Sequence, residues 1–241
     1  MSQALNSGTH FDKLDRELAK DIIARSCERV APPPKLKISQ WASRYRRLAR
    51  ESSAEPGLWR NEKTPYLVDV MDSVNHPRTQ EIIIQASSQV GKSEVLLNVL
   101  GYFIHQDPAP ILCVFPNLDL CETFSKDRIA PMIRDTEVLA DLVDEPKSKD
   151  SSNTIKHKDF PGGNLDIVTA VSPTGLASKV KRITLLDEID RFPASAGGEG
   201  DPIKLASRRQ DTYAHNRKLI ACSTPTSLQT SKIYKLYCVE K

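Results

Sequence analysis

The sequence is poor in the features that mark secreted, metal-stapled and membrane proteins. Its five cysteines form no CxxC pair and its five histidines form no HxxxH pair, which argues against a disulfide framework or a structural zinc site. No apolar run approaches the ~18 residues of a membrane span, and the polar first 20 residues lack the apolar core of a secretory signal. We therefore expect a cytoplasmic protein with reduced thiols and no membrane partner.

Charge is distributed unevenly along the chain. The 241 residues suffice for one large domain or two small ones, and their net charge is only +3. Residues 1–60 carry +5, residues 61–150 carry −7 and residues 151–241 carry +5. Basic ends permit contact with a polyanion. Taken alone, however, the pattern is more simply interpreted as solvated surface charge.

Apolar β-branched runs alternate with helical periodicity after residue 80. We predict strands at 81–86, 111–115, 154–158, 164–170, 182–187 and 218–223, and helices at 92–105, 118–133, 136–144 and 202–213. This alternation predicts a parallel sheet covered on both faces. The earlier residues predict helices at 10–29, 38–50 and 66–74, with three prolines at 32–34 and a loop at 51–63.

A candidate phosphate-binding loop follows the first strand. Its residues are Ser87, Ser88, Gln89, Val90, Gly91, Lys92 and Ser93. Backbone N–H groups of such a loop surround a β-phosphate, Lys92 bridges β- and γ-oxygens, and the Ser93 hydroxyl ligates Mg²⁺. Ala86 replaces the first glycine of the GxxxxGK[ST] pattern, a mild change where no positive φ is required. The alternative is an ordinary helix N-terminus with Lys92 as a surface charge.

Two adjacent acids end the strand at 182–187. Asp187 would hold Mg²⁺, and Glu188 would polarise the water that attacks the γ-phosphate. The pair follows Lys92 by 95 residues with at least one strand between, a pattern of P-loop ATPases that carry a catalytic glutamate. We therefore predict an α/β fold of the RecA/ASCE-like P-loop NTPase class: a three-layer sandwich with a central, mostly parallel sheet, preceded by an N-terminal helical segment.

The last predicted strand and several arginines complete the candidate site. Ser223 and Thr224 end the strand at 218–223, where hydroxyls can sense the γ-phosphate and transmit its loss; an ordinary turn explains them equally well in isolation. An arginine is needed to stabilise transition-state charge. Arg128, Arg134, Arg182, Arg208 and Arg209 are candidates, and Arg128, Arg208 and Arg209 are the three we carry forward as arginine fingers. For any single one of them, a surface ion pair is the simpler interpretation.

These motifs, taken in order, resemble the large terminase subunit of lambda-like phages, a family of genome-packaging ATPases. The resemblance covers roughly residues 38–232. It rests on Trp41-Ala42, Pro56-Gly57-x-Trp59, Pro65-Tyr66-Leu67, Gln89-Val90-Gly91-Lys92-Ser93, Pro116-Asn117, Ile133-Arg134-Asp135-Thr136, Ser172-Pro173-x-Gly175-Leu176, Asp187-Glu188-x-Asp190 and Ser223-Thr224-Pro225.

The resemblance implies an ATP- and Mg²⁺-dependent motor that translocates double-stranded DNA into a procapsid in the bacterial host cytoplasm. The implied partners are DNA phosphates, a small terminase subunit and the procapsid portal, with the chain working as a homo-oligomeric ring. It implies that Lys92 and Ser93 act on phosphates and Mg²⁺, Asp187 on Mg²⁺, Glu188 in catalysis and Ser223-Thr224 in coupling. Tyr66 lies where such motors stack adenine, although a core tyrosine is equally consistent.

Domain organisation and rival functions remain open at this point. We expect a helical and linker segment at 1–60 and an ATPase domain at 61–241. With only 16 residues after Pro225, we expect no nuclease domain in this chain. The helix at 10–29 either docks a small subunit or caps the core. The rivals are a fragment of a superfamily 2 helicase, because residues 187–190 fit a DExD box, and a prophage remnant that binds nucleotide without turnover.

Overall fold

The computed structural model describes residues 16, 18–20, 35–143, 153–177 and 179–239. The chain divides into two units, Met1–Lys35 and Leu36–Lys241. In the first unit, residues 16 and 18–20 are helical, and the remainder of the helix expected at 10–29 lies outside the described residues. The second unit begins well before residue 61, because Trp41 and its neighbours are buried in the same core as the later helices.

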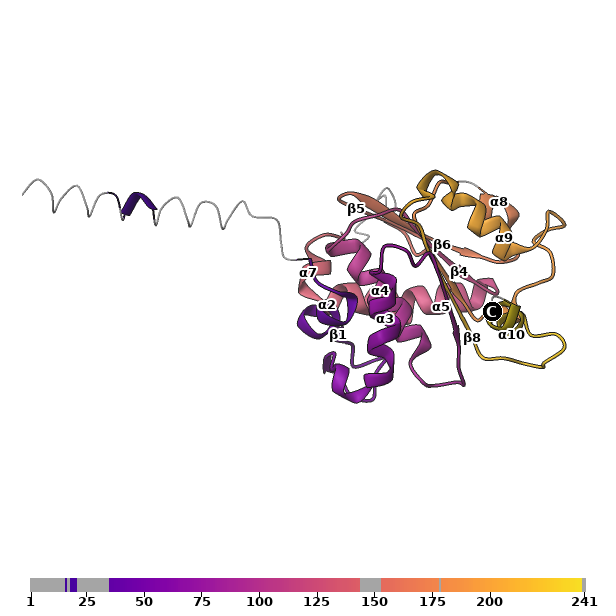
Figure 1. Cartoon of the computed structure of the whole chain (residues 1–241), viewed down its shortest axis with the longest axis horizontal. Helices are drawn as coiled ribbons and strands as arrows, with labels where there is room; N and C mark the ends of the chain where they lie inside the picture. Colours follow the sequence, from indigo (N-terminus) through magenta and orange to yellow (C-terminus); the bar gives the residue numbers. More distant parts are fainter. Residues whose placement is uncertain (1–15, 17, 21–34, 144–152, 178, 240–241) are drawn as a thin grey trace, which may run out of the picture. The chain divides into compact units, whose positions relative to one another are not determined.

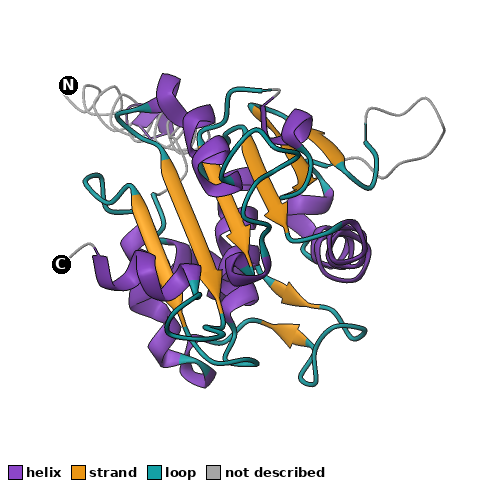
Figure 2. Cartoon of the chain, turned by 90° about the vertical axis from the view of Figure 1, so that its right-hand side faces the viewer, coloured by secondary structure: helices purple, strands orange, loops and turns teal. Residues whose placement is uncertain are grey.

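A six-stranded sheet forms the centre of the second unit (Figure 2). Its strands, in spatial order, are β3 (Glu81–Gln85), β8 (Lys218–Ser223), β7 (Ile183–Asp187), β4 (Ile111–Phe115), β6 (Gly163–Thr169) and β5 (His157–Phe160). Neighbouring strands are parallel except for the β5–β6 hairpin. β8 lies between β3 and β7, so the strand that separates the lysine strand from the acidic strand in space comes after both of them in the sequence.

The central strands are buried on both faces. Every residue of β4, β7 and β8 is buried, as expected for parallel strands that helices cover on both sides. Their apolar, β-branched sequences suit this environment, because such side chains pack well on a pleated surface. The mostly parallel α/β sheet predicted from the sequence is therefore present.

Two layers of helices enclose the sheet (Figure 1). The first layer contains α2 (Ile38–Tyr45), α3 (Val68–Val74), α4 (Lys92–His105), α5 (Leu118–Phe124), α6 (Ala130–Asp135) and α7 (Glu137–Ala140). The second contains α8 (Pro173–Ala177), α9 (Pro202–Ser207) and α10 (Lys232–Val239). Helix α4 is buried almost all round. Trp41 of α2 packs directly on Gly101 of α4, because a Cβ atom at position 101 would lie 2.2 Å from the indole ring.

The structure corrects several predicted boundaries. The helix expected at 38–50 ends at Tyr45, and β1 (Arg47–Leu48) then pairs with β2 (Gly57–Leu58) inside the expected loop. The backbone leaves the helix here because tertiary hydrogen bonds hold it extended: Arg47 N–H donates to Thr136 Oγ1 at 3.1 Å, and Trp59 N–H donates to the Arg46 carbonyl at 2.9 Å.

Other segments are helical but not uniformly so. The predicted helix at 118–133 comprises α5, a π-helical turn η3 (Ser125–Ile129) and α6. Short 3₁₀ helices occur at η1 (Asn61–Lys63), η2 (Pro65–Leu67), η4 (Ile189–Arg191) and η5 (Arg208–Tyr213). Helices α8 and α10 were not predicted. No helix in the described ranges is long and apolar enough to cross a membrane.

Candidate nucleotide-binding site

The predicted site residues meet at the carboxyl edge of the sheet. Strand register places Gln85, the end of β3, opposite Ser223, the end of β8. It also places Asp187, the end of β7, opposite Cys222 of β8. Because parallel strands finish at the same edge, the loop after β3, the acidic turn after β7 and the hydroxyl segment after β8 are neighbours. This edge is where α/β sheets bind ligands.

The loop after β3 has the backbone of a phosphate-binding loop. Gly91 is the N-terminal cap of α4 with φ 87°, and Gln89 has φ 59°, so two loop residues adopt the left-handed conformation. A side chain at Gly91 would be strained and would place a Cβ 2.9 Å from Leu67. The turn directs the first residues of the buried helix α4, whose free N–H groups favour anions, toward the sheet edge.

Lys92 is held at the centre of this edge. Its side chain is 5% exposed, and its ammonium group donates to the Ser87 carbonyl at 2.7 Å and to Thr224 Oγ1 at 2.9 Å. An ammonium group has three donors, so one remains for a phosphate oxygen. Lys92 is therefore a buried cation between the loop and the segment after β8, and the alternative of a surface charge is wrong.

Ser93 and Asp187 converge as a pair of oxygen ligands. Ser93 Oγ donates to Asp187 Oδ2 at 3.3 Å. Burial raises the pKa of Asp187, and hydrogen bonds from Cys222 and Ser93 oppose that rise. A hydroxyl and a carboxylate oxygen are ligands that Mg²⁺ accepts, with phosphate and water supplying the others. The residues present therefore fit the metal that the sequence implies.

Glu188 follows Asp187 in a left-handed turn with φ 56°. The left-handed conformation is strained for a residue other than glycine. Among the described residues, none forms a hydrogen bond or ion pair with the Glu188 carboxylate. The group is half-buried and free to accept a hydrogen bond from water.

Asp190 has a different role from Glu188, although both belong to the same acidic motif. Its Oδ2 accepts hydrogen bonds from the N–H and hydroxyl of Thr226 at 2.9 and 3.1 Å, and its Oδ1 accepts from Ile233 N–H at 2.8 Å. Its own N–H donates to Ser223 Oγ at 3.2 Å. Asp190 thus connects the acidic turn to the Ser223–Thr226 segment and to the start of α10.

Tyr66 and a neighbouring cleft lie beside the loop. Tyr66 is 58% exposed, and its hydroxyl donates to the Val90 carbonyl at 3.3 Å. A cleft of about 360 Å³ borders the loop; its lining includes Leu58, Trp59, Arg60, Lys63, Gly91 and Glu94. Tyr66 does not line this cleft, so Trp59 and its neighbours are an additional surface that sequence reasoning did not assign. The only available signal was the Pro56-Gly57-x-Trp59 motif.

Of the three arginine-finger candidates, the structure places Arg128 beside the loop. Its guanidinium contacts Glu94 Oε1 in the first turn of α4. Arg46, which is 3% exposed and was not predicted, contacts the other oxygen of Glu94 at 3.2 Å. Burial lowers the pKa of Arg46, and Glu94 opposes that effect. Sequence reasoning missed this Arg46–Glu94–Arg128 cluster because it depends on three separate elements.

The other two finger candidates lie elsewhere. Arg208 is exposed and lines a cleft together with Glu81. Glu81 is the first residue of β3, so this cleft lies at the end of the sheet opposite to the phosphate loop. Arg209 donates through Nη1 to the Ala177 carbonyl at 2.8 Å, and its own carbonyl accepts from Lys181 N–H at 2.9 Å. Arg209 therefore anchors the chain before β7. Neither side chain is near the phosphate loop of its own chain.

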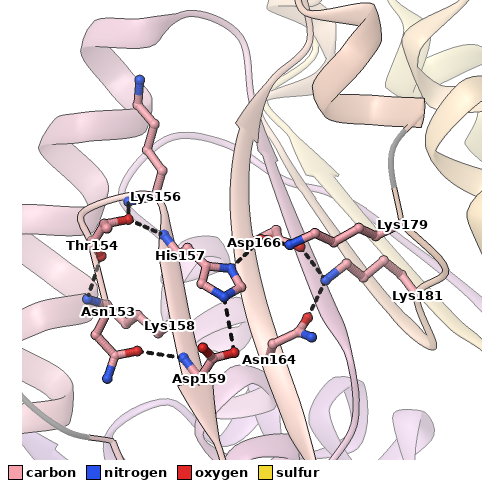
Figure 3. A network of polar contacts seen from close by, with 10 residues as sticks. All are labelled: Asn153, Thr154, Lys156, His157, Lys158, Asp159, Asn164, Asp166, Lys179 and Lys181. Atoms are coloured by element: carbon pink, nitrogen blue, oxygen red, sulfur yellow. Dashed lines mark hydrogen bonds and ion pairs between the residues drawn. The ribbon is translucent and has the colours of Figure 1, made fainter. Parts of the chain in front are cut away.

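The basic segment before β7 is largely neutralised by its own chain (Figure 3). Lys181 is 1% exposed and lies 2.6 Å from Asp166 Oδ2, and Lys179 lies 3.4 Å from Oδ1 of the same carboxylate. Arg182 contacts both carboxylate oxygens of Asp107, at 3.0 and 2.5 Å. Acidic residues of the same chain therefore pair with all three of these cations.

A parallel sheet with this strand order, a glycine-lysine-serine turn opening a buried helix and an acidic strand end beside it define a P-loop NTPase fold. The family described as "Phage terminase large subunit gpA, ATPase domain" matches residues 53–239. The chain belongs to this family, as the sequence motifs predicted.

Individual relatives agree with this assignment. The chain is 28% identical over 181 residues to the large terminase subunit of Enterobacteria phage P21, and 28% identical over 203 residues to that of Escherichia phage lambda. These alignments cover 75% and 84% of the chain but only 28% and 31% of the relatives. The crystal structure of the HK97 bacteriophage large terminase shares the fold, with a TM-score of 0.63 and 15% identity over 85% of this chain and 40% of that one.

Proposed function

We propose that the chain is an Mg²⁺-dependent ATPase, and that it powers the movement of double-stranded DNA into a procapsid as the motor part of a terminase large subunit. The observation that carries the proposal is the 3.3 Å contact between Ser93 Oγ and Asp187 Oδ2, two residues 94 positions apart. It joins the hydroxyl of the phosphate loop to the acid at the end of another strand. Membership of the terminase ATPase-domain family supports the same conclusion.

The residues divide the work of hydrolysis among them. Loop N–H groups and Lys92 hold the β- and γ-phosphates of ATP, while Ser93 and Asp187 hold Mg²⁺. Mg²⁺, when bound, offsets negative charge on the phosphate oxygens. The Glu188 carboxylate orients a water toward the γ-phosphate and accepts its proton. Thr224, hydrogen bonded to Lys92, connects the state of the phosphate to the segment after β8.

The test compares three variants with the unaltered chain. We expect Lys92→Ala to weaken ATP binding and to lower turnover about 100-fold, because a buried cation is lost from the phosphates. We expect Glu188→Gln to bind ATP normally and to hydrolyse it about 10²- to 10⁴-fold more slowly. Lys126→Ala is the matched control, since this lysine is exposed and pairs with Glu122 of the preceding helical turn. Normal turnover in Lys92→Ala would contradict the proposal.

The partners of this motor are also proposals. We infer a ring of identical chains at the procapsid portal in the cytoplasm of the bacterial host, supplied with DNA by a small terminase subunit. We infer that, within such a ring, Arg208 serves a neighbouring chain's nucleotide and Arg128 serves that of its own chain; the exposure of Arg208 and the contact of Arg128 with Glu94 support this division. Mixing Arg208→Ala chains with Lys92→Ala chains tests this role: a Lys92→Ala chain still carries Arg208 and can serve the intact nucleotide site of a neighbouring Arg208→Ala chain. Turnover restored by mixing would support action in trans, and no restoration would refute it.

We further propose that these 241 residues do not cut DNA. Two-metal cleavage needs several carboxylates around ions that lie ~3.5–4 Å apart. In the part of the chain that the structure describes, no three metal-binding side chains gather in one place. Incubation of the purified chain with supercoiled plasmid and Mg²⁺ or Mn²⁺ tests this. Nicking that co-purifies with the chain and is lost in an acid-to-amide variant would overturn it.

A further inference from the structure

The carboxylate of Asp187 is held from two sides. Ser93 Oγ approaches Oδ2 at 3.3 Å, and the thiol of Cys222 approaches Oδ1 at 3.0 Å. Cys222 is fully buried in β8, directly opposite Asp187 in the ladder between β7 and β8. Strand register therefore fixes the thiol against the oxygen that faces away from Ser93.

The direction of this hydrogen bond follows from the chemistry of the two groups. An ionised carboxylate only accepts hydrogen bonds, whereas a thiol has a hydrogen to donate. Among the described residues, the Cys222 thiol is the one hydrogen-bond partner of Oδ1. Asp187 is itself only 6% exposed, so water has little access to replace a lost donor, and an unsatisfied buried carboxylate oxygen is costly.

We propose that Cys222 is a positioning residue for the metal-binding carboxylate of Asp187. By holding Oδ1, the thiol turns Oδ2 toward Ser93 Oγ, the place where the proposed function puts Mg²⁺. Removal of a residue that hydrogen-bonds a metal ligand, without itself contacting the metal, commonly lowers metal affinity by 10- to 100-fold. The inference rests on the proposed function, because it assumes that Asp187 is a metal ligand.

The experiment measures metal-dependent nucleotide binding without turnover. A fluorescent, non-hydrolysable ATP analogue is titrated onto the full chain with saturating Mn²⁺ and again with EDTA. The dissociation constant in EDTA divided by the dissociation constant in Mn²⁺ reports how much the metal contributes to binding. We expect Cys222→Val to lower this ratio about tenfold, with binding in EDTA unchanged. We expect Cys222→Ser, which keeps a donor, to stay within about threefold of the unaltered chain.

Two controls separate the hydrogen bond from packing and from the metal assignment. Cys113 is a buried cysteine of β4, the strand next to β7 on the side away from β8. Cys113→Val should leave the ratio unchanged. Asp187→Asn should abolish the metal contribution. If Asp187→Asn lowers the ratio while Cys222→Val does not, the role of Cys222 is refuted and the proposed function stands. If Asp187→Asn leaves the ratio unchanged, the metal assignment itself fails.

Thermal unfolding of each variant guards against a folding artefact. If Cys222→Val does not fold, Cys222→Ala is compared with Cys222→Ser in the same assay, and an equal loss in both overturns the inference. The inference is also overturned if Cys222→Val weakens binding of the nucleotide analogue in EDTA as much as in Mn²⁺, or if Cys113→Val lowers the ratio equally. Either result would indicate that the substitution disturbs packing of the sheet in general.

Discussion

The side chains of Lys92 and Thr224 are joined by a 2.9 Å hydrogen bond across 132 positions of the sequence. Lys92 opens helix α4 at the phosphate loop, and Thr224 follows the last strand of the sheet. Lys92, the cation expected to hold the γ-phosphate, is therefore hydrogen bonded to the predicted coupling segment. We expect a γ-phosphate that contacts Lys92 to compete with this hydrogen bond and so to affect Thr224.

This contact predicts a specific defect in Thr224→Val. The variant keeps the shape of the side chain and removes the hydroxyl that accepts from Lys92. We expect ATP binding to change less than threefold and turnover to fall about tenfold, the equivalent of one hydrogen bond to a charged group. Thr224→Ser, which keeps the hydroxyl, should retain most of the activity. The exposed Thr230 provides the control Thr230→Val. Unchanged kcat in Thr224→Val would show that the contact has no role in turnover.

The contacts of Asp190 predict that its substitution lowers the stability of the fold more than the rate of ATP hydrolysis. Burial acts to raise the pKa of Asp190, but hydrogen bonds from Ile233, Ser231 and Thr226 outweigh it and leave the pKa below its usual value. Asp190→Ala removes the acceptor for these donors and should lower the free energy of unfolding by about 1–3 kcal/mol. The measurement is urea unfolding, combined with ATP turnover of the folded variant.

Turnover in Asp190→Ala is expected to fall far less than in Glu188→Gln. The comparison decides which acid of the motif activates water. A Glu188→Gln variant with normal hydrolysis beside an inactive but stably folded Asp190 variant would assign the catalytic role to Asp190 and contradict the site described above.

Much of this fold was predictable because its signals are local. Helix α4 was predicted with both boundaries correct, since Gly91 marks its start and apolar residues continue to His105. Strand β4 was also predicted correctly, as an uninterrupted apolar run between turn residues. The loop, the acidic strand end and the hydroxyl segment were predicted from sequence, and their meeting at one sheet edge followed from the rule that parallel strands share an edge.

The missed features all depend on contacts between distant segments. Arg46 falls within the helix predicted at 38–50, where a charged residue is expected to face water, yet it is buried and pairs with Glu94 of α4. The two-residue strands β1 and β2 are too short to leave a periodic pattern. The thiol contact of Cys222 with Asp187 requires the register between β7 and β8, which sequence alone does not specify.

The polar network at the β5–β6 hairpin predicts a pH-dependent stability (Figure 3). Burial acts to raise the pKa of Asp166, but hydrogen bonds from Lys181 and His157 outweigh it and leave the pKa below its usual value. Its stabilisation is therefore present above the unfolded pKa of about 3.9 and is lost as pH falls through the lower folded pKa. Asp166→Asn removes the carboxylate that pairs with the buried Lys181 and should cost about 3 kcal/mol at neutral pH.

Urea unfolding at several pH values tests this network. The difference between the unaltered chain and Asp166→Asn should be constant above about pH 5 and should shrink below about pH 4. Asp159→Asn is the control: Asp159 is 49% exposed and pairs with His157, so its loss should cost less than about 1 kcal/mol. A difference for Asp166→Asn that does not change across this pH range would show that its carboxylate charge is not the source of the stability.

DNA binding is expected to depend on cations that the fold leaves free. Lys181 and Arg182 are engaged by Asp166 and Asp107, whereas Lys204 and Arg208 are exposed and line one shallow cleft. Contacts from these two residues to phosphates release counterions and carry no sequence information. We therefore expect the double variant Lys204→Ala/Arg208→Ala to weaken binding to unrelated DNA duplexes equally.

The salt dependence of binding gives the sharper measurement. For each phosphate contact, log K falls with log salt concentration with a slope of about −0.9, so the double variant should reduce the magnitude of the slope by about 2. Lys126→Ala, which removes an exposed lysine at the start of η3, is the matched control and should leave the slope unchanged. If the double variant binds with the original slope while the control alters it, the DNA surface lies on the opposite layer of helices, and the assignment to α9 and η5 is wrong.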